Sequence, residues 1–136
     1  MLYFITMREK ILKILLLFGA IFYLVGAIVH YFNITLFPWF DSALYSPYHD
    51  SIIAMASLAI SGFFFATYLD PKKNIGNLWV IIIVALLSGI LTISMGYTTD
   101  FFSLYGSALK SVQAGVEGWL LIILSVLVFI LKPNKQ

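Results

Sequence analysis

The sequence predicts an all-α integral membrane protein with four transmembrane helices in an antiparallel bundle. Four apolar runs occupy residues 11–32, 52–69, 78–97 and 107–131 of the 136-residue chain. A hydrocarbon core about 30 Å thick requires roughly 20 helical residues, and each run is near that length. Hydrophobic residues make up 62% of the chain and charged residues only 10%, which is more apolar surface than a soluble core of this size would cover. Backbone groups in lipid must be paired within the segment, so we expect helices and a single domain spanning residues 1–136.

Basic residues mark one side of the predicted membrane domain. When the four spans cross the membrane in alternating directions, seven of the eight basic residues flank one side of the membrane, and Lys110 lies on the other side. The seven are Arg8, Lys10, Lys13, Lys72, Lys73, Lys132 and Lys135. Because basic flanks stay in the cytoplasm, the sequence predicts a multi-pass cell-membrane protein with both termini cytoplasmic. These residues lie at membrane borders rather than in a solvated basic patch, which excludes nucleic acid as a partner.

The first connection, residues 33–50, is rich in aromatic side chains, which suit the headgroup zone and also act as anchors in protein contacts. We expect partners in the membrane besides the lipid bilayer, either other transmembrane subunits or further copies of this chain. The candidate interface residues are Trp39, Tyr45, Tyr48, Lys110 and Trp119.

Small residues predict where the helices pack against one another. They recur on one face of each of the first three spans, where they allow helix backbones to approach closely. The predicted seams are Gly19, Ala20, Gly26 and Ala27 in the first span, Ala54, Ser57 and Ser61 in the second, and Ser88, Thr92 and Gly96 in the third.

The fourth span begins with a polar stripe at helical spacing, which predicts a face that avoids lipid. The stripe consists of Ser103, Ser107, Lys110, Ser111, Ala114, Glu117 and Gly118. An ionisable group near the membrane usually has a partner, and the candidates for Glu117 are His30, His49 and Lys110. The alternative is a carboxylate that reaches the headgroups.

Histidines and carboxylates are expected at one membrane level, the end of the bundle that carries the first connection. This candidate metal or polar cluster comprises His30, Asp41, His49, Asp50 and Glu117. Imidazole and carboxylate are ligands that Cu²⁺ or Zn²⁺ accepts, while the alternative is hydrogen bonding at the interface. Haem is disfavoured, because both histidines lie at helix ends rather than inside the bundle. Cysteine is absent, which excludes thiolate sites.

No sequence motif for catalysis is present. The chain has no Gly-x-Ser-x-Gly, no His-Glu-x-x-His and no glycine-rich phosphate loop. We therefore predict no catalytic residue and no catalysis by the chain alone.

One segment resembles a known family. The residues are Asp41-Ser42-Ala43, then Pro47-Tyr48-His49, an apolar helix, and Tyr68-Leu69-Asp70-Pro71-Lys72. This stretch of about 32 residues resembles the metal-bearing helix region of the C-type subunit of membrane-bound ammonia and methane monooxygenases. The family's metal site uses an aspartate and two histidines, and Asp41 and His49 match the first two at a longer spacing. No histidine follows His49, so the resemblance implies a companion subunit rather than the catalytic one.

Two function classes follow from these observations. The first is a small accessory, non-catalytic subunit of a multi-subunit membrane complex, such as a copper-dependent monooxygenase or a respiratory complex. The second is a membrane protein that binds a metal or small ligand through the histidine and carboxylate cluster.

Overall fold

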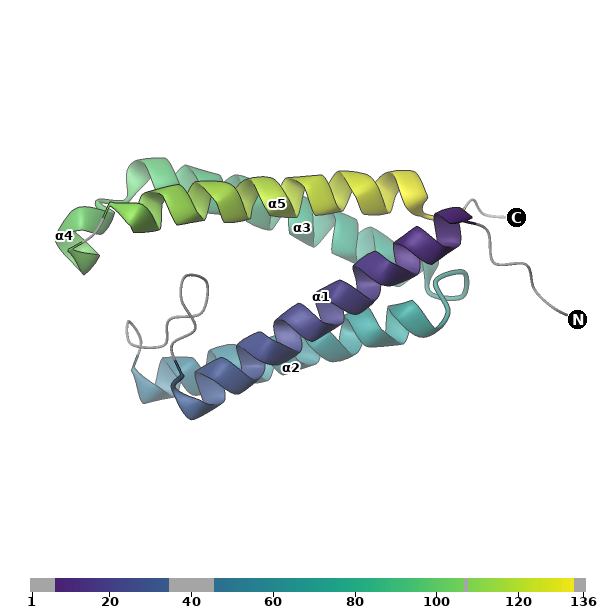
Figure 1. Cartoon of the computed structure of the whole chain (residues 1–136), viewed down its shortest axis with the longest axis horizontal. Helices are drawn as coiled ribbons and strands as arrows, with labels where there is room; N and C mark the ends of the chain where they lie inside the picture. The colour runs from purple at the N-terminus through teal and green to yellow at the C-terminus, as the bar shows by residue number, and fades with distance from the viewer. Residues whose placement is uncertain (1–6, 35–45, 107, 134–136) are drawn as a thin grey trace, which may run out of the picture. The chain divides into compact units, whose positions relative to one another are not determined.

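The computed structural model describes residues 7–34, 46–106 and 108–133, and their regular structure is entirely helical (Figure 1). The helices are α1 (Met7–Phe32), α2 (Pro47–Leu69), α3 (Ile75–Thr98), α4 (Phe101–Tyr105) and α5 (Leu109–Leu131). Within the described residues, all but α4 are long and apolar enough to cross a membrane. The prediction of an all-α membrane protein with four spanning helices is therefore confirmed. The chain divides into two compact units, Met1–Asn74 and Ile75–Gln136.

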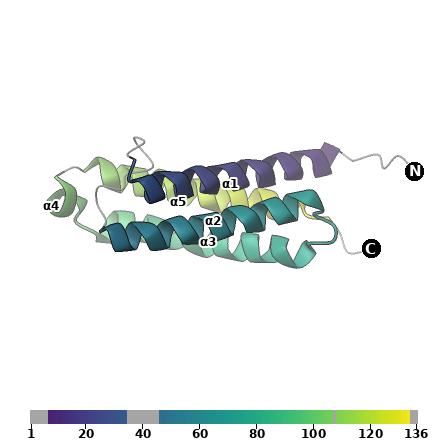
Figure 2. The same cartoon turned by 90° about the horizontal axis from the view of Figure 1, so that it is seen from below.

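The first unit is a hairpin of two antiparallel helices, α1 and α2, which we call the first hairpin (Figure 2). Its seam is the small-residue face predicted from the sequence. Buried positions on it are Gly19, Ala20, Gly26, Ala27, Ala54 and Ser61, whereas Ser57 is half-buried. The Ser61 hydroxyl donates to the Ala20 carbonyl across the seam at 2.7 Å. Small side chains thus bring the backbones close enough for a hydroxyl of one helix to reach a carbonyl of the other.

Capping residues set both ends of α2. Ser46 is the N-cap and Pro47 occupies the first helical turn, where its missing N–H costs no hydrogen bond. For this reason α2 begins at Pro47, before the predicted residue 52. At the other end Asp70 has φ −146° and ψ 86°, because the following Pro71 disfavours a helical conformation.

An ion pair links the turn after α2 to the start of α1. The Nζ atom of Lys72 lies 2.9 Å from Oε2 of Glu9.

The second unit contains another antiparallel pair, α3 and α5, which we call the second hairpin. Two glycines face each other where the helices cross: a Cβ at Gly89 would lie 2.7 Å from the carbonyl oxygen of Gly118. Side chains larger than hydrogen therefore do not fit there. Ser125 donates to the Ile82 carbonyl at 2.8 Å, and Ser111 donates to the Gly96 carbonyl at 2.5 Å. Both hairpins thus use serine-to-carbonyl bonds between helices.

The predicted seam of α3 is displaced. Gly89 is buried at the crossing although the prediction did not include it, and the predicted Ser88 is half-buried. Gly96 lies on the seam as expected, where its carbonyl accepts the Ser111 hydroxyl. Residues on the row that contacts α5 and on the row beside it both repeat every three or four positions. The sequence pattern therefore did not distinguish the two rows.

The expected single helix from Ser103 to Gly118 is wrong. Asp100 caps α4 by accepting bonds from the Ser103 hydroxyl at 2.6 Å and from its backbone N–H at 3.1 Å. These two bonds hold the pKa of Asp100 below its ordinary value. Gly106 then ends α4 with a left-handed φ of 67°, and α5 begins at Leu109 rather than at residue 107. Ser103 therefore lies on a different helix from Gly118, while Ser107 is outside the described residues.

Candidate functional site

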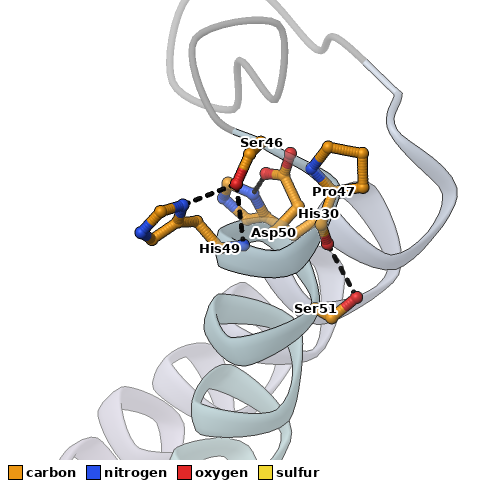
Figure 3. Close-up of polar contacts among 6 residues, drawn as sticks. All are labelled: His30, Ser46, Pro47, His49, Asp50 and Ser51. Carbon is orange, nitrogen blue, oxygen red and sulfur yellow. Dashed lines mark hydrogen bonds and ion pairs between the residues drawn. The ribbon is translucent and has the colours of Figure 1, made fainter.

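A histidine and an aspartate meet at the end of the first hairpin that carries the connection between α1 and α2. His30 lies in the last turn of α1 and Asp50 in the first turn of α2. The His30 Nδ1 and Asp50 Oδ1 atoms are 2.8 Å apart (Figure 3). Their side chains are 12% and 3% exposed. The structure thus joins two of the five predicted cluster residues directly, and we call them the His30–Asp50 pair.

Two unlike helix termini meet at this pair. The C-terminus of a helix carries partial negative charge and favours a cation, whereas the N-terminus carries partial positive charge and favours an anion. His30 is near the first kind of end and Asp50 near the second. An antiparallel hairpin places these two ends side by side, so the fold brings the His30 imidazole to the Asp50 carboxyl group.

The hydrogen bond also sets the chemistry of the imidazole. When Asp50 is ionised, its carboxylate only accepts hydrogen bonds, and Nδ1 of His30 then carries the proton of this bond. In the neutral ring the lone pair is then on Nε2. A histidine oriented in this way by a carboxylate is the usual arrangement of a metal-ligating or proton-transferring imidazole.

His49 serves the local structure of α2. The Ser46 hydroxyl lies 2.6 Å from His49 Nδ1 and accepts from the His49 backbone N–H at 3.4 Å (Figure 3). The residue is exposed, and its ring contacts the edge of Tyr48 with a centroid distance of 5.8 Å. The Ser46 hydroxyl therefore caps α2, and the His49 ring is its hydrogen-bond partner.

The other predicted site residues are distributed over the chain. Trp39, Asp41 and Tyr45 lie outside the described residues. Tyr48 is 72% exposed at the start of α2. Lys110 is half-buried and Trp119 is 59% exposed, both on α5.

Glu117 has a partner that the sequence analysis did not consider. Gln113, one turn earlier on α5, donates its Nε2 hydrogen to Glu117 Oε1 at 3.0 Å. A side-chain pair four residues apart on a helix is a regular source of such bonds, and this spacing was the signal that would have identified it. Ser46 was also missed, although a serine before a proline at the start of an apolar run is a helix-start signal.

Within residues 7–34, 46–106 and 108–133, no three histidine, aspartate or glutamate side chains gather closely enough to hold an ion. His30, through Nε2, is the described residue best arranged as a ligand, with Asp50 as the group that orients it.

The sequence matches no family model, and neither a curated protein nor a solved structure is detectably similar to it.

Proposed function

We propose that this chain is a small accessory subunit of a larger multi-subunit membrane complex, without catalytic activity of its own. The observation that carries the proposal is a second small-residue face on α2. Its exposed residues are Ala56, Ala59, Gly62 and Ala66. A Cβ at Gly62 would meet no atom within 4 Å.

This face points away from α1. Ala56 and Ala59 each lie two residues from a buried position, Ala54 and Ser61 respectively, which is about 200° around a helix. Lipid tails are as apolar as leucine, so helices in a membrane associate where small residues permit close backbone packing. The first hairpin uses one such face of α2 internally, and the second is suited to a transmembrane helix of another subunit.

The chemistry at the end of the first hairpin supports one kind of complex over others. We place the chain with a membrane oxidoreductase, either a copper-dependent monooxygenase or a respiratory complex. Support comes from the resemblance of residues 41–72 to the C-type monooxygenase subunit and from the His30–Asp50 pair. In this proposal the exposed Tyr48 and the aromatic connection before it contact the partner chain at the headgroup level.

Gly62→Leu is expected to release the chain from its complex while leaving the first hairpin folded, because a Cβ at this exposed position meets no atom within 4 Å. Membranes are extracted in a mild detergent, and particle size and composition are measured for each variant. Gly76→Leu is the matched control, since Gly76 is also exposed with open space around it but lies in the first turn of α3.

An unchanged particle size for Gly62→Leu would contradict the proposal. A particle that contains only copies of this chain would indicate a homo-oligomer instead of an accessory subunit in a larger complex.

Metal or small-ligand binding is the second candidate function, and the His30–Asp50 pair is the observation that favours it. A monodisperse isolated chain that retains stoichiometric Cu²⁺ or Zn²⁺, and loses it in His30→Gln but not in His49→Gln, would favour this function over the accessory role.

The orientation that we propose has both termini in the cytoplasm, since basic residues flank that side of the spans. Reporter fusions at Gln136 and within the connection 35–45 are expected to report opposite sides of the cell membrane, with Gln136 inside. An extracytoplasmic fusion at Gln136 would contradict this orientation.

A further inference from the structure

The second hairpin has an open apolar groove of about 400 Å³ along α3 and α5. Its walls include Trp79, Ile83 and Leu86 of α3 and Val126 and Phe129 of α5. The volume is within the range of about 300–1,000 Å³ that is typical of small-molecule sites. The lining also contains Ser125, which donates its hydroxyl to the carbonyl of Ile82 at 2.8 Å. The groove therefore offers mainly hydrocarbon contact to an occupant.

A cation lies at one end of this groove. The Lys132 Nζ is 5.1 Å from the ring centroid of Trp79 and 4.5 Å from that of Phe129. The two rings contact each other edge to face, with centroids 5.8 Å apart. Both rings line the groove, so the ammonium group of Lys132 lies over the aromatic end of this apolar groove.

The local sequence places the lysine there. Pro133 disfavours helix at the residue before it, and Lys132 accordingly has φ −55° and ψ 143° and ends α5. A lysine at a helix C-terminus interacts favourably with the last carbonyls. Tryptophan and lysine at the end of a span are also the residues expected at the level of the lipid headgroups.

We propose that this groove is a binding site for an anionic phospholipid, with an acyl chain against Ile83, Leu86 and Val126 and the phosphate beside Lys132. Charge complementarity selects this occupant, because an apolar groove that ends in a cation matches a tail that ends in an anion. A zwitterionic lipid presents the same tail without net negative charge. Since a lysine near a membrane surface contributes about 1 kcal/mol to the attraction of anionic lipid, the expected preference is about fivefold.

The test is native mass spectrometry of the full chain in a mild detergent, titrated with phosphatidylglycerol or phosphatidylcholine of identical acyl chains. One phosphatidylglycerol per chain is expected to be retained in preference to phosphatidylcholine. Lys132→Gln is expected to weaken phosphatidylglycerol binding about fivefold and to leave phosphatidylcholine binding unchanged. Lys132→Arg preserves the charge and should keep the preference. Val126→Trp fills the groove and should weaken binding of both lipids.

Lys110→Gln is the charge-matched control, because Lys110 lies at the other end of α5 and the same charge is removed from the chain. Far-UV circular dichroism of each variant verifies that it is helical. Equal retention of both lipids by the unmodified chain would overturn the proposal. Equal losses in Lys132→Gln and Lys110→Gln would also overturn it, and so would displacement of the lipid by inorganic phosphate alone.

Discussion

Gly118→Leu is expected to destabilise the second hairpin by roughly 3 kcal/mol, at the upper end of the cost of overpacking. A Cβ at Gly118 would lie 2.5 Å from Ile93 Cγ1, 2.7 Å from the carbonyl oxygen of Gly89 and 3.0 Å from the backbone nitrogen of Ile93. The Ile93 side chain can rotate away, but the two backbone atoms belong to α3 and move only if the helices separate. The free energy of unfolding, measured by denaturant titration in detergent micelles, checks this expectation.

Gly115→Leu provides the control for helix propensity and hydrophobicity. Gly115 is on the same helix, and a Cβ there would meet no atom within 4 Å. We expect this variant to be as stable as the unmodified chain or more so, since leucine is the better helix former. Similar losses of stability for both variants would show that the crossing at Gly89 and Gly118 is not the close contact described above.

His30→Leu is expected to destabilise the first hairpin by about 3 kcal/mol, because removal of one partner leaves the buried Asp50 carboxyl group without its hydrogen bond. Asp50 is 2% exposed, so water does not replace the lost hydrogen bond. Thermal unfolding of the purified chain in detergent, followed by circular dichroism, measures the effect.

The double variant His30→Leu/Asp50→Leu separates the effect of the unpaired polar group from the loss of packing. Replacement of both partners by apolar side chains of similar size is often neutral in stability, so the double variant should recover most of the loss. His49→Leu is the comparison for an exposed histidine. We expect it to lower the free energy of unfolding by less than about 1 kcal/mol, as for the loss of a helix cap. A double variant no more stable than His30→Leu would mean that the His30–Asp50 pair stabilises the hairpin through its packing rather than through its hydrogen bond.

Pairing within the candidate site was only partly predictable. The sequence placed His30 and Asp50 at one membrane level, because helix ends at the same membrane surface share a depth. It did not distinguish Asp50 from Asp41 or Glu117 as the partner of His30, since depth alone leaves the rotation of each helix free. The 2.8 Å contact depends on the rotation of α1 and α2 about their axes, which side-chain packing along the whole seam determines.

The acceptors of the hydrogen bonds from Ser61 and Ser125 were likewise not predictable from the sequence. Ser61 was predicted as a seam residue, whereas Ser125 was not singled out. Their acceptors, the carbonyls of Ala20 and Ile82, belong to residues without any distinguishing chemistry. Every residue has a carbonyl group, so a pattern of side chains does not identify the one that a hydroxyl reaches.

The sequence by itself determined the class of this protein and its four spans, because transfer of a helix into lipid depends on the summed hydropathy of about 20 consecutive residues. The end of α5 at Leu131 is also local, since Pro133 disfavours helix at the residue before it. The start of α2 was predicted at residue 52 and lies at Pro47 instead, although Ser46 and Pro47 form a helix-start signal. Only the tertiary structure decided that α1 pairs with α2 and α3 with α5, and that Gly89 rather than Ser88 lies at the crossing. Helix pairing depends on which surfaces fit when two helices cross, and that fit is a property of side chains far apart in the chain.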